Sequence, residues 1–399
     1  MINSKILPHM HVHPSATVYI NSLAIQKQAQ GEKVYNFAAG DPVYPNHEKI
    51  VQAAIKIVEG GKIPYPPTWG VSYLRELAAQ WMNNSYDTHY SKENVLITCG
   101  GKFGLYAIVQ ALLEKEDVVL IPTPYWVSYP PIVKLFGASI QLITPKEKTE
   151  KITVQDIRES ISSHTKMLIL NSACNPTGVV YTREELAQIL AFAKEHGIIV
   201  VSDEVYSGLV YEGPYVSCGS FREHAEHVVV IQSCSKNFGM TGWRVGFVLG
   251  PPALIETLAM IQSQSTTGTS LVSQLAAIGA LENVEEVNSK LKAAMQKRRD
   301  IFISIYNKLF AQQLPPPNAG LYVFAPISSL GVDYYDSQAF CNQLMERGNI
   351  MVVPGISFGV EGYVRYAFSE EEQTIEEGLH KLHTICQALK NNYLQPIRK

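Results

Sequence analysis

Short, almost continuously apolar segments alternate with longer helical patterns through the middle of this sequence. The apolar segments are NVLIT (94–98), DVVLI (117–121), KMLIL (166–170), IIVV (198–201), VVVIQ (228–232) and RVGFVLG (244–250). Helical patterns lie between them, for example at 101–114 and at 183–195, where Thr182 and Glu185 have the spacing of a capping box. Strands that are apolar at successive positions are typical of sheets covered by helices on both faces. The pattern therefore predicts an α/β fold with a mainly parallel, doubly covered sheet.

The C-terminal part has a different pattern. A helical stretch at about 281–311 leads to LPPPNAGLYVF (314–324), where prolines interrupt the chain before a strand. Further strand patterns and a terminal helix follow, which suggests a smaller α+β unit. We expect a large cofactor-binding domain at residues 46–285. We expect residues 1–45, which include an N-terminal arm, to join residues 286–399 in the small domain.

Composition and charge narrow the class of protein. The 399 residues are 46% hydrophobic and 17% charged, and the net charge is −3, so neither nucleic acid nor an anionic membrane is expected as a partner. No apolar run approaches a membrane span, and the first residues lack the apolar core of a signal peptide. The six cysteines form no CxxC pair. We therefore expect a cytoplasmic enzyme with reduced thiols.

Ligands of parallel sheets bind beyond the carboxyl ends of the strands, and four groups of residues are expected there. In TCGGKFG (98–104) a glycine turn opens a helix near Gly101, and free backbone N–H groups at a helix start suit a phosphate. In NSACNPTG (171–178), Asn175 precedes proline and is biased to a turn. The first two groups therefore offer an anion site and an amide.

The other two groups carry ionisable side chains. In VVSDEVY (200–206), Asp203 ends an apolar strand and needs a cationic or donor partner, and Tyr206 can reach the same pocket. Lys236 stands among small residues in SCSKNFGMTGWRVGF (233–247), together with two serines and with Arg244, whose guanidinium suits a phosphate. Burial there would lower the pKa of the lysine and keep its amine reactive.

These four groups match the needs of pyridoxal phosphate. Its aldehyde bonds a lysine, its ring nitrogen pairs with a carboxylate, and its phosphate takes several donors. Each feature alone has an ordinary explanation, such as a strand-to-helix turn, a helix cap or a surface lysine. Their combination predicts pyridoxal phosphate as the cofactor, with no metal.

The same segments resemble the fold-type I, class I pyridoxal-phosphate aminotransferases, from PSATVYIN (14–21) to VRYAFS (364–369). The motifs NPTG, SDEVY, SCSKNFGMTGWRVG and VVPG occur in that order. PSATV, GGK, PYWVSYP and SQSTT are most similar to the bacterial aspartate aminotransferase subgroup. The resemblance implies that family's fold, with a large and a small domain.

The resemblance implies roles for individual residues around the cofactor ring. Lys236 would form the Schiff base with the cofactor and later move a proton between the substrate Cα and the cofactor. Asp203 would pair with the ring nitrogen, and Asn175 and Tyr206 would hydrogen-bond the 3-oxygen. Trp126, in PYWVSY, would stack on the ring.

The resemblance also implies how the phosphate and the substrate are held. The phosphate ligands would be backbone groups of Gly101 and Lys102 together with Ser233, Ser235 and Arg244. Tyr65 would reach the phosphate of the neighbouring subunit, so the active sites would form only in a homodimer. Arg365 would bind the substrate α-carboxylate, and Gly40, Trp126 and Asn175 would line the same pocket.

Substrate specificity depends on Lys102 and Thr17. In the subgroup that the chain resembles, a lysine and a threonine at these positions meet the distal carboxylate of aspartate or glutamate. A lysine in the first helical turn opposes the helix dipole at roughly 0.3–1 kcal/mol, and an exposed lysine tolerated at that small cost is the alternative. The resemblance implies aspartate:2-oxoglutarate transamination by a ping-pong mechanism. Aromatic or broad-range transamination, β-elimination and a non-catalytic cofactor-binding regulator are the alternatives.

The N-terminal histidines leave two questions open. His13 stands where the subgroup often has a basic residue, so activity towards prephenate stays open. His9, His11 and His13 would share one side of an extended strand, which suits a metal. No carboxylate or cysteine completes such a site, so we interpret the segment as an arm near the dimer interface.

Three cysteines stand within the motifs, namely Cys99, Cys174 and Cys234. The family usually has other residues at Cys174 and Cys234. We therefore predict that the three thiols cluster near the cofactor, and that thiol modification inhibits the enzyme unless the cofactor is bound.

Overall fold

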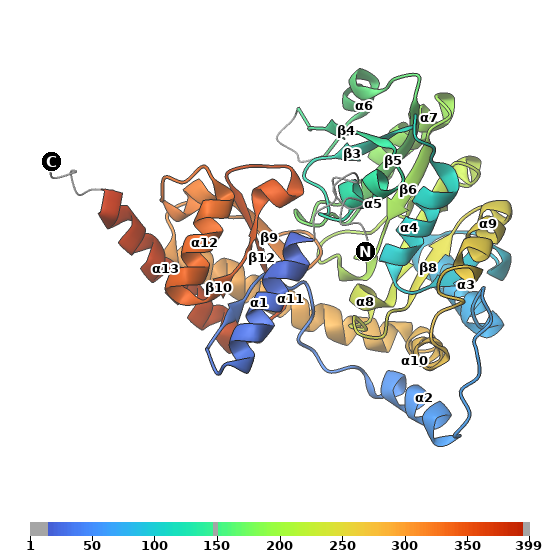
Figure 1. Cartoon of the computed structure of the whole chain (residues 1–399), viewed down its shortest axis with the longest axis horizontal. Coiled ribbons are helices and arrows are strands. Elements are labelled where there is room, and N and C mark those ends of the chain that lie inside the picture. Colours follow the sequence, from blue (N-terminus) through green and yellow to red (C-terminus); the bar gives the residue numbers. More distant parts are fainter. Residues whose placement is uncertain (1–14, 147–150, 394–399) are drawn as a thin grey trace, which may run out of the picture.

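The computed structural model describes residues 15–146 and 151–393, so the histidine run at 9–13 lies outside the described residues (Figure 1). The strands are β1 (Tyr35–Asn36), β2 (Val95–Thr98), β3 (Val118–Pro122), β4 (Ser139–Ile143), β5 (Thr165–Asn171), β6 (Ile199–Asp203), β7 (Val228–Ser233), β8 (Gly246–Leu249), β9 (Tyr322–Pro326), β10 (Ile350–Met351), β11 (Val353–Pro354) and β12 (Tyr363–Ala367). The α-helices are α1 (Ala16–Ala29), α2 (Glu48–Glu59), α3 (Ser72–Tyr86), α4 (Gly101–Leu112), α5 (Tyr129–Leu135), α6 (Val154–Ser160), α7 (Arg183–Glu195), α8 (Cys234–Asn237), α9 (Pro252–Ser263), α10 (Leu271–Leu281), α11 (Val284–Leu309), α12 (Ser337–Gly348) and α13 (Glu372–Tyr393). Short 3-10 turns are η2 (Lys92–Asn94), η3 (Ser207–Leu209), η4 (Cys218–Ser220), η5 (Arg222–His224), η6 (Ile327–Leu330) and η7 (Gly355–Phe358).

A seven-stranded sheet forms the centre of the larger part, in the order β2-β8-β7-β6-β5-β3-β4. Its strands are parallel to their neighbours except β8, which is antiparallel to both β2 and β7. The predicted α/β fold with a mainly parallel sheet is confirmed. The pattern missed β4 because this edge strand is mostly exposed and lacks a continuous apolar run.

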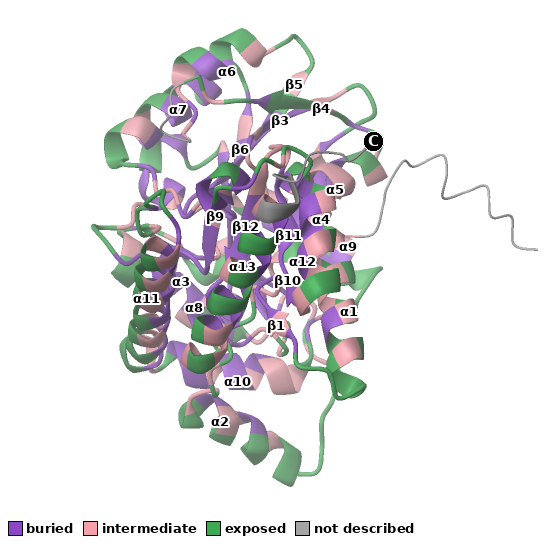
Figure 2. Cartoon of the chain, turned by 90° about the vertical axis from the view of Figure 1, so that its left-hand side faces the viewer, coloured by how far each residue is buried: buried purple, intermediate pink, exposed green. Residues whose placement is uncertain are grey.

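The apolar runs are continuous because both faces of the sheet are covered. On β5, Leu168 and Leu170 pack into the cluster formed with α3, α7 and α10. Met167 and Ile169 pack into the opposite cluster, formed with α4, α5 and α9. Figure 2 shows the sheet strands as buried and the outer faces of the surrounding helices as partly exposed. Alternate residues of one strand therefore stabilise two separate cores.

Helix α7 begins where the sequence predicts. The Thr182 hydroxyl accepts a hydrogen bond from the Glu185 N–H at 3.3 Å, and the Glu185 carboxylate accepts one from the Thr182 N–H at 2.7 Å. This reciprocal pair is the predicted capping box. It satisfies two backbone donors that the helix start would leave unpaired.

The C-terminal part has a separate antiparallel sheet, in the order β11-β12-β9. The N-terminal segment lies against it, because β1 pairs with β10 and Phe37 packs into the core formed by α11, α12 and α13. Figure 1 shows α1 beside this part and α2 beside the other. The domain limits at 45/46 and 285/286 stay a prediction.

This arrangement brings two sets of residues face to face. The carboxyl ends of β5, β6 and β7 lie next to the start of α4, and residues of β9 and β12 face them across a cavity. Within residues 15–146 and 151–393, no helix is both long and apolar enough to cross a membrane.

Candidate active site

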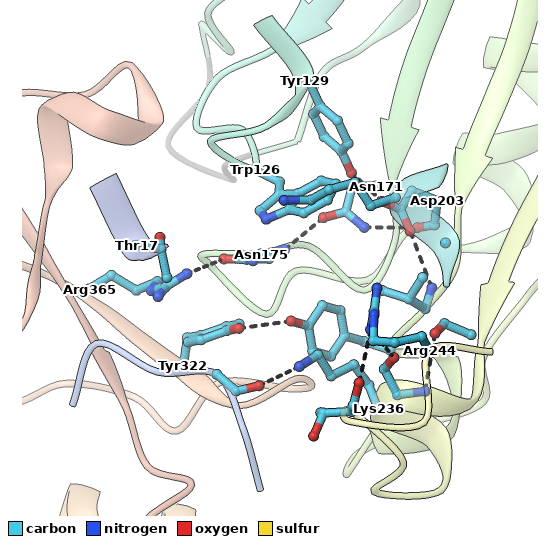
Figure 3. Close-up of a pocket in the computed structure, with 18 residues that line it drawn as sticks. Thr17, Trp126, Tyr129, Asn171, Asn175, Asp203, Lys236, Arg244, Tyr322 and Arg365 are labelled. Atoms are coloured by element: carbon cyan, nitrogen blue, oxygen red, sulfur yellow. Dashed lines mark hydrogen bonds between the residues drawn. The ribbon is translucent and has the colours of Figure 1, made fainter. Parts of the chain in front are cut away.

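One cavity of about 240 Å³ lies between the two sheets (Figure 3). Its lining contains every site residue predicted from the sequence except Tyr65. The lining residues are Thr17, Gly40, Gly101, Lys102, Trp126, Tyr129, Asn171, Asn175, Asp203, Val205, Tyr206, Ser233, Ser235, Lys236, Thr241, Arg244, Tyr322 and Arg365. Thr17, Gly40, Tyr322 and Arg365 come from segments that pack with the C-terminal part, and the others come from the larger part.

A buried carboxylate lies at the end of β6. Asp203 is 5% exposed, and its Oδ2 accepts a hydrogen bond from the Tyr129 hydroxyl at 2.7 Å. Burial raises the pKa of Asp203 to about 6, although the hydrogen bonds from Tyr129 and from the Val205 N–H lower it. Asn171 holds the adjacent backbone, since its amide donates to the Asp203 carbonyl at 2.8 Å. A cation placed beside Asp203 would therefore replace solvation that burial has removed.

Lys236 lies on the single turn of α8, directly after β7. The Ser233 hydroxyl begins this turn and accepts from the Ser235 N–H at 3.1 Å. The Lys236 ammonium donates to the Gly40 carbonyl, which belongs to the N-terminal segment. Desolvation by burial lowers the pKa of Lys236. The amine is thus confined at the cavity wall and biased toward its neutral, nucleophilic form.

The start of α4 forms a cradle for an anion. Gly100 precedes the helix with φ +77°, and a Cβ at this position would overlap the Arg244 guanidinium. Arg244 donates to the Ser235 hydroxyl at 3.5 Å and to the Thr241 carbonyl at 2.9 Å. The start of a 12-residue helix, two serine hydroxyls and a guanidinium therefore converge on one end of the cavity.

Arg365, on β12, is the largest side chain of those almost fully removed from solvent, at 1% exposure. It donates to the Asn175 Oδ1 at 3.1 Å and to the Ala38 carbonyl at 2.6 Å. Its Nε is buried and has no hydrogen-bond partner among the described residues. A buried guanidinium with no acidic partner among these contacts is suited to binding a carboxylate that enters the cavity.

Lys102 and Thr17 line the same cavity. The Lys102 ammonium lies 5.0 Å from the centroid of the Trp126 ring, and desolvation and then the nearby Arg244 lower the pKa of Lys102. It forms no ion pair with a residue in the described ranges. The Thr17 Oγ1 is buried and, among the same residues, has no partner.

Sequence reasoning missed Tyr129, Asn171, Val205, Thr241 and Tyr322. Asn171 is the last residue of β5, so the rule that placed Asp203 could have identified it. Tyr129 stands in the same PYWVSYP motif as Trp126. Nothing local marks Tyr322, which reaches the cavity only because β9 packs opposite the large sheet.

Several predictions lie outside this cavity. Tyr65 is 89% exposed, and its predicted contact with a second subunit stays a prediction. Cys99, Cys174 and Cys234 are not among the residues that line the cavity, and the hypothesis that these thiols cluster near the cofactor stays a prediction. Cys234 is fully buried, and burial raises the pKa of its thiol. Among the described residues, no group of three or more His, Cys, Asp or Glu side chains could hold a metal ion.

Comparison with known proteins identifies the family. The family model for class I and II aminotransferases matches residues 32–382. The chain is 34% identical over 372 residues to the aspartate/prephenate aminotransferase of Thermus thermophilus, which covers 92% of this chain and 95% of that protein. It is 33% identical over 385 residues to the aspartate aminotransferase of Geobacillus stearothermophilus, with coverage of 94% and 97%. The solved structure of aspartate aminotransferase from Thermus thermophilus with maleate aligns with a TM-score of 0.89 at 32% identity, and covers 94% of this chain and 97% of that chain.

The family match covers well over half of the chain, and it agrees with the fold and with the set of side chains in the cavity. A confined lysine, a buried carboxylate and an anion cradle meet at the ends of the central strands. The chain therefore belongs to the class I and II aminotransferases, enzymes that transfer amino groups with pyridoxal phosphate as cofactor.

Proposed function

We propose that this enzyme transfers the amino group of aspartate to 2-oxoglutarate, in a cytoplasmic homodimer with shared active sites. The observation that carries the substrate assignment is that Arg365 and Lys102 line one cavity and that neither forms an ion pair with a described residue. A dicarboxylate such as aspartate offers one carboxylate to each of them. When bound, pyridoxal phosphate supplies an aldehyde that takes up the amino group and a ring that withdraws electrons from the substrate Cα.

The residues present fit this cofactor. The glycine turn before α4 leaves room for the Arg244 guanidinium, which a Cβ on Gly100 would overlap, and Gly101, Ser233, Ser235 and Arg244 line the cavity as groups that would hold a phosphate. Asp203 would hold a protonated ring nitrogen, because a cation restores the stability of a carboxylate whose pKa burial has raised to about 6. The Trp126 ring, half-buried above the cavity, offers a face for stacking (Figure 3).

Lys236 would bond the cofactor aldehyde and, after the substrate amine displaces it, would move the proton from the substrate Cα. Its low pKa favours the neutral amine that this step requires. The Gly40 carbonyl accepts a hydrogen bond from the amine and so holds it at the cavity wall. Lys236 would act as general base first and as general acid when it returns the proton to the cofactor carbon.

Arg365 would bind the α-carboxylate that every amino acid carries. Its Nε lacks a partner, and a carboxylate would satisfy it while one guanidinium nitrogen stays anchored to the Ala38 carbonyl. Asn175 links this group to the cofactor end, because it also accepts from Arg365 at 3.1 Å. This contact orients any amino acid without selecting its side chain.

Lys102 and Thr17 would select the acidic side chain. A carboxylate near Lys102 would compensate for the neighbouring Arg244 charge, which contributes to the lowered pKa of Lys102. The buried Thr17 hydroxyl supplies a donor that has no other partner among the described residues. The proposal is supported by relatives named as aspartate or aspartate/prephenate aminotransferases, and by a solved relative that holds maleate, a dicarboxylate.

A homodimer is favoured by one exposed surface. Ile63, Tyr65 and Met260 are 52%, 89% and 59% exposed, and exposed apolar groups that form a contiguous patch mark interaction sites. The loop that carries Ile63 and Tyr65 is attached to α9, which carries Met260, since the Gln262 amide donates to the Thr68 carbonyl at 2.6 Å. The cytoplasmic assignment is favoured by six cysteines without a disulfide.

The first test is spectroscopic. L-aspartate alone, added to purified holoenzyme, should abolish the visible absorbance of the lysine-bound cofactor and release about one oxaloacetate per site, because each site can complete only half of the ping-pong reaction. Further turnover should require 2-oxoglutarate. Conversion by aromatic amino acids or with prephenate, but not by aspartate, would overturn the substrate assignment. Release of ammonia and pyruvate from a β-substituted amino acid would indicate β-elimination, and no conversion of any amino acid would indicate a regulator.

The shared site has its own test. Homodimers of K236A and of Y65F should both be impaired. An equal mixture that is allowed to exchange subunits should contain intact sites amounting to about a quarter of all sites, because about half of the dimers are mixed and one of the two sites in each mixed dimer has both residues. A monomer in light scattering, or no recovery on mixing, would contradict the shared site.

A further inference from the structure

Tyr322 connects two residues to which separate roles have been assigned above. Its hydroxyl lies 2.8 Å from the Tyr206 hydroxyl, and the centroid of its ring lies 4.1 Å from the Arg365 guanidinium carbon. Tyr322 and Arg365, both labelled in Figure 3, stand on neighbouring strands of the small sheet. Tyr206 follows β6 of the large sheet. The contact therefore crosses the cavity between the two parts of the molecule.

We propose that Tyr322 is a positioning residue that donates its hydrogen bond to Tyr206, and so directs the Tyr206 hydrogen toward the 3-oxygen of the cofactor. A phenol has a single hydrogen, so only one of the two hydroxyls can be the donor in the pair. This inference rests on the proposed roles of Tyr206 and Arg365. It adds a residue that no motif in the sequence indicated.

Either hydroxyl can donate in the observed geometry, and the position of Arg365 over the Tyr322 ring favours Tyr322 as the donor. A cation above an aromatic ring is attracted by the ring electrons and draws them toward itself, which makes the phenol of Tyr322 the better donor. Tyr206 then accepts, and its own hydrogen is free for an acceptor inside the cavity. Successive hydrogen bonds of this kind polarise one another, so each strengthens the next. The positive charge of Arg365 thus strengthens, through Tyr322, the hydrogen bond that Tyr206 donates to the cofactor 3-oxygen.

The position of the Tyr322 hydroxyl is tightly restricted. Tyr322 is 4% exposed, and a Cβ on Gly40 would overlap its hydroxyl oxygen. The Gly40 carbonyl meanwhile accepts from Lys236. Tyr322 therefore packs against the same backbone segment that holds the reactive lysine, and only glycine at position 40 leaves room for this contact.

The test is a pH titration of the visible spectrum of the resting holoenzyme, which needs no turnover. Without the Tyr322 hydroxyl, Tyr206 becomes a weaker donor, and the proton shared by the 3-oxygen and the lysine nitrogen is held more tightly. Y322F should therefore raise the midpoint of the titration by about 0.5–1 pH unit. G40A should raise it as well, because the added Cβ displaces the hydroxyl, and it serves as a second variant should Y322F fold poorly.

A matched control removes a buried phenolic hydroxyl from the neighbouring strand at a residue that does not line the cavity. Tyr366, on β12, is fully buried, and its hydroxyl has no partner among the described residues. Y366F should leave the midpoint unchanged. Y206F, measured in parallel, separates the two proposals: if Y206F shifts the midpoint and Y322F does not, Tyr322 does not act through Tyr206. If neither shifts it, both the role of Tyr206 and the coupling are refuted.

Binding of maleate to the resting holoenzyme tests the contact with Arg365. Y322F keeps the ring and should bind maleate as the unaltered enzyme does, whereas Y322L removes the ring and should weaken binding by about 2- to 30-fold. Equal maleate affinity in all three proteins would refute the contribution of the ring. A loss of the same size in Y322F and Y322L would show that the hydroxyl, rather than the ring, supports Arg365.

Discussion

The hydrogen bond from Tyr129 should determine the pH range in which Asp203 can pair with the cofactor. The Tyr129 hydroxyl donates to the Asp203 Oδ2 at 2.7 Å, and both side chains are buried. A hydrogen bond to a charged group contributes about 1.5–3 kcal/mol, which corresponds to roughly 1–2 pKa units. Y129F should therefore raise the pKa of Asp203 from about 6 to about 7.5.

This shift in the pKa of Asp203 predicts how the affinity of the apoenzyme for the cofactor depends on pH. At pH 7 the ionised fraction of Asp203 would fall from about nine-tenths to about one-quarter, so the apoenzyme should bind the cofactor about fourfold more weakly. The dissociation constant of the cofactor in the variant, divided by that in the unaltered enzyme, should rise to about 15 at pH 6 and approach one at pH 9. Asp203 binds a cation only when ionised, and above both pKa values the two proteins have the same charge.

The assay is calorimetric titration of apoenzyme with pyridoxamine phosphate, which cannot bond Lys236 and so reports reversible binding. Y181F is the matched control, because Tyr181 is also a buried phenol of the larger part but contacts the Ile152 N–H instead of Asp203. A loss of affinity that is the same at pH 6 and pH 9 would refute the reasoning, since it would show a steric effect without a change in the pKa of Asp203.

Three further predictions concern the charged side chains. K102Q should lower kcat/KM for aspartate by about 10- to 100-fold and leave alanine almost unaffected, because only aspartate has a distal carboxylate; equal losses for both substrates would contradict the assignment. R365K should lower kcat/KM for every amino acid, since lysine cannot form the paired hydrogen bonds of a guanidinium; a loss confined to dicarboxylates would argue against binding of the α-carboxylate. The pKa of Asp203 is raised from its ordinary 3.8 to about 6, so the folded apoenzyme binds this proton more tightly than the unfolded chain, and the resulting destabilisation develops between about pH 4 and pH 6 and is complete above that range. D203N apoenzyme should therefore be more stable at pH 8 by up to ~3 kcal/mol in urea unfolding, and the difference should vanish as the pH falls toward 4; a difference that does not change with pH would refute this.

Local patterns in the sequence were sufficient for the central sheet and for the residues at its strand ends. The apolar segments became β2, β3, β5, β6, β7 and β8, because a strand buried on both faces must be apolar at every position. Asp203 is the last residue of β6 and Lys236 comes three residues after the end of β7, so the chain itself places them at the edge where parallel sheets bind ligands. Arg365, Gly40 and Thr17, by contrast, were assigned from a family resemblance, since no local pattern brings them to this edge.

Only the tertiary structure decided which distant side chains meet there. Tyr322 contacts Tyr206 across 116 positions of the chain, and Arg365 contacts Asn175 across 190. Burial of apolar surface drives such packing, and it is non-directional, so the hydrophobic pattern does not specify which sheet faces which. The sequence by itself determined the elements and the chemistry available at their ends. The packing of the small sheet opposite the large one decided how Tyr322 and Arg365 meet that chemistry, and the packing of α5 on the large sheet brought Tyr129 to Asp203, because contacts between remote segments exist only once the chain has folded.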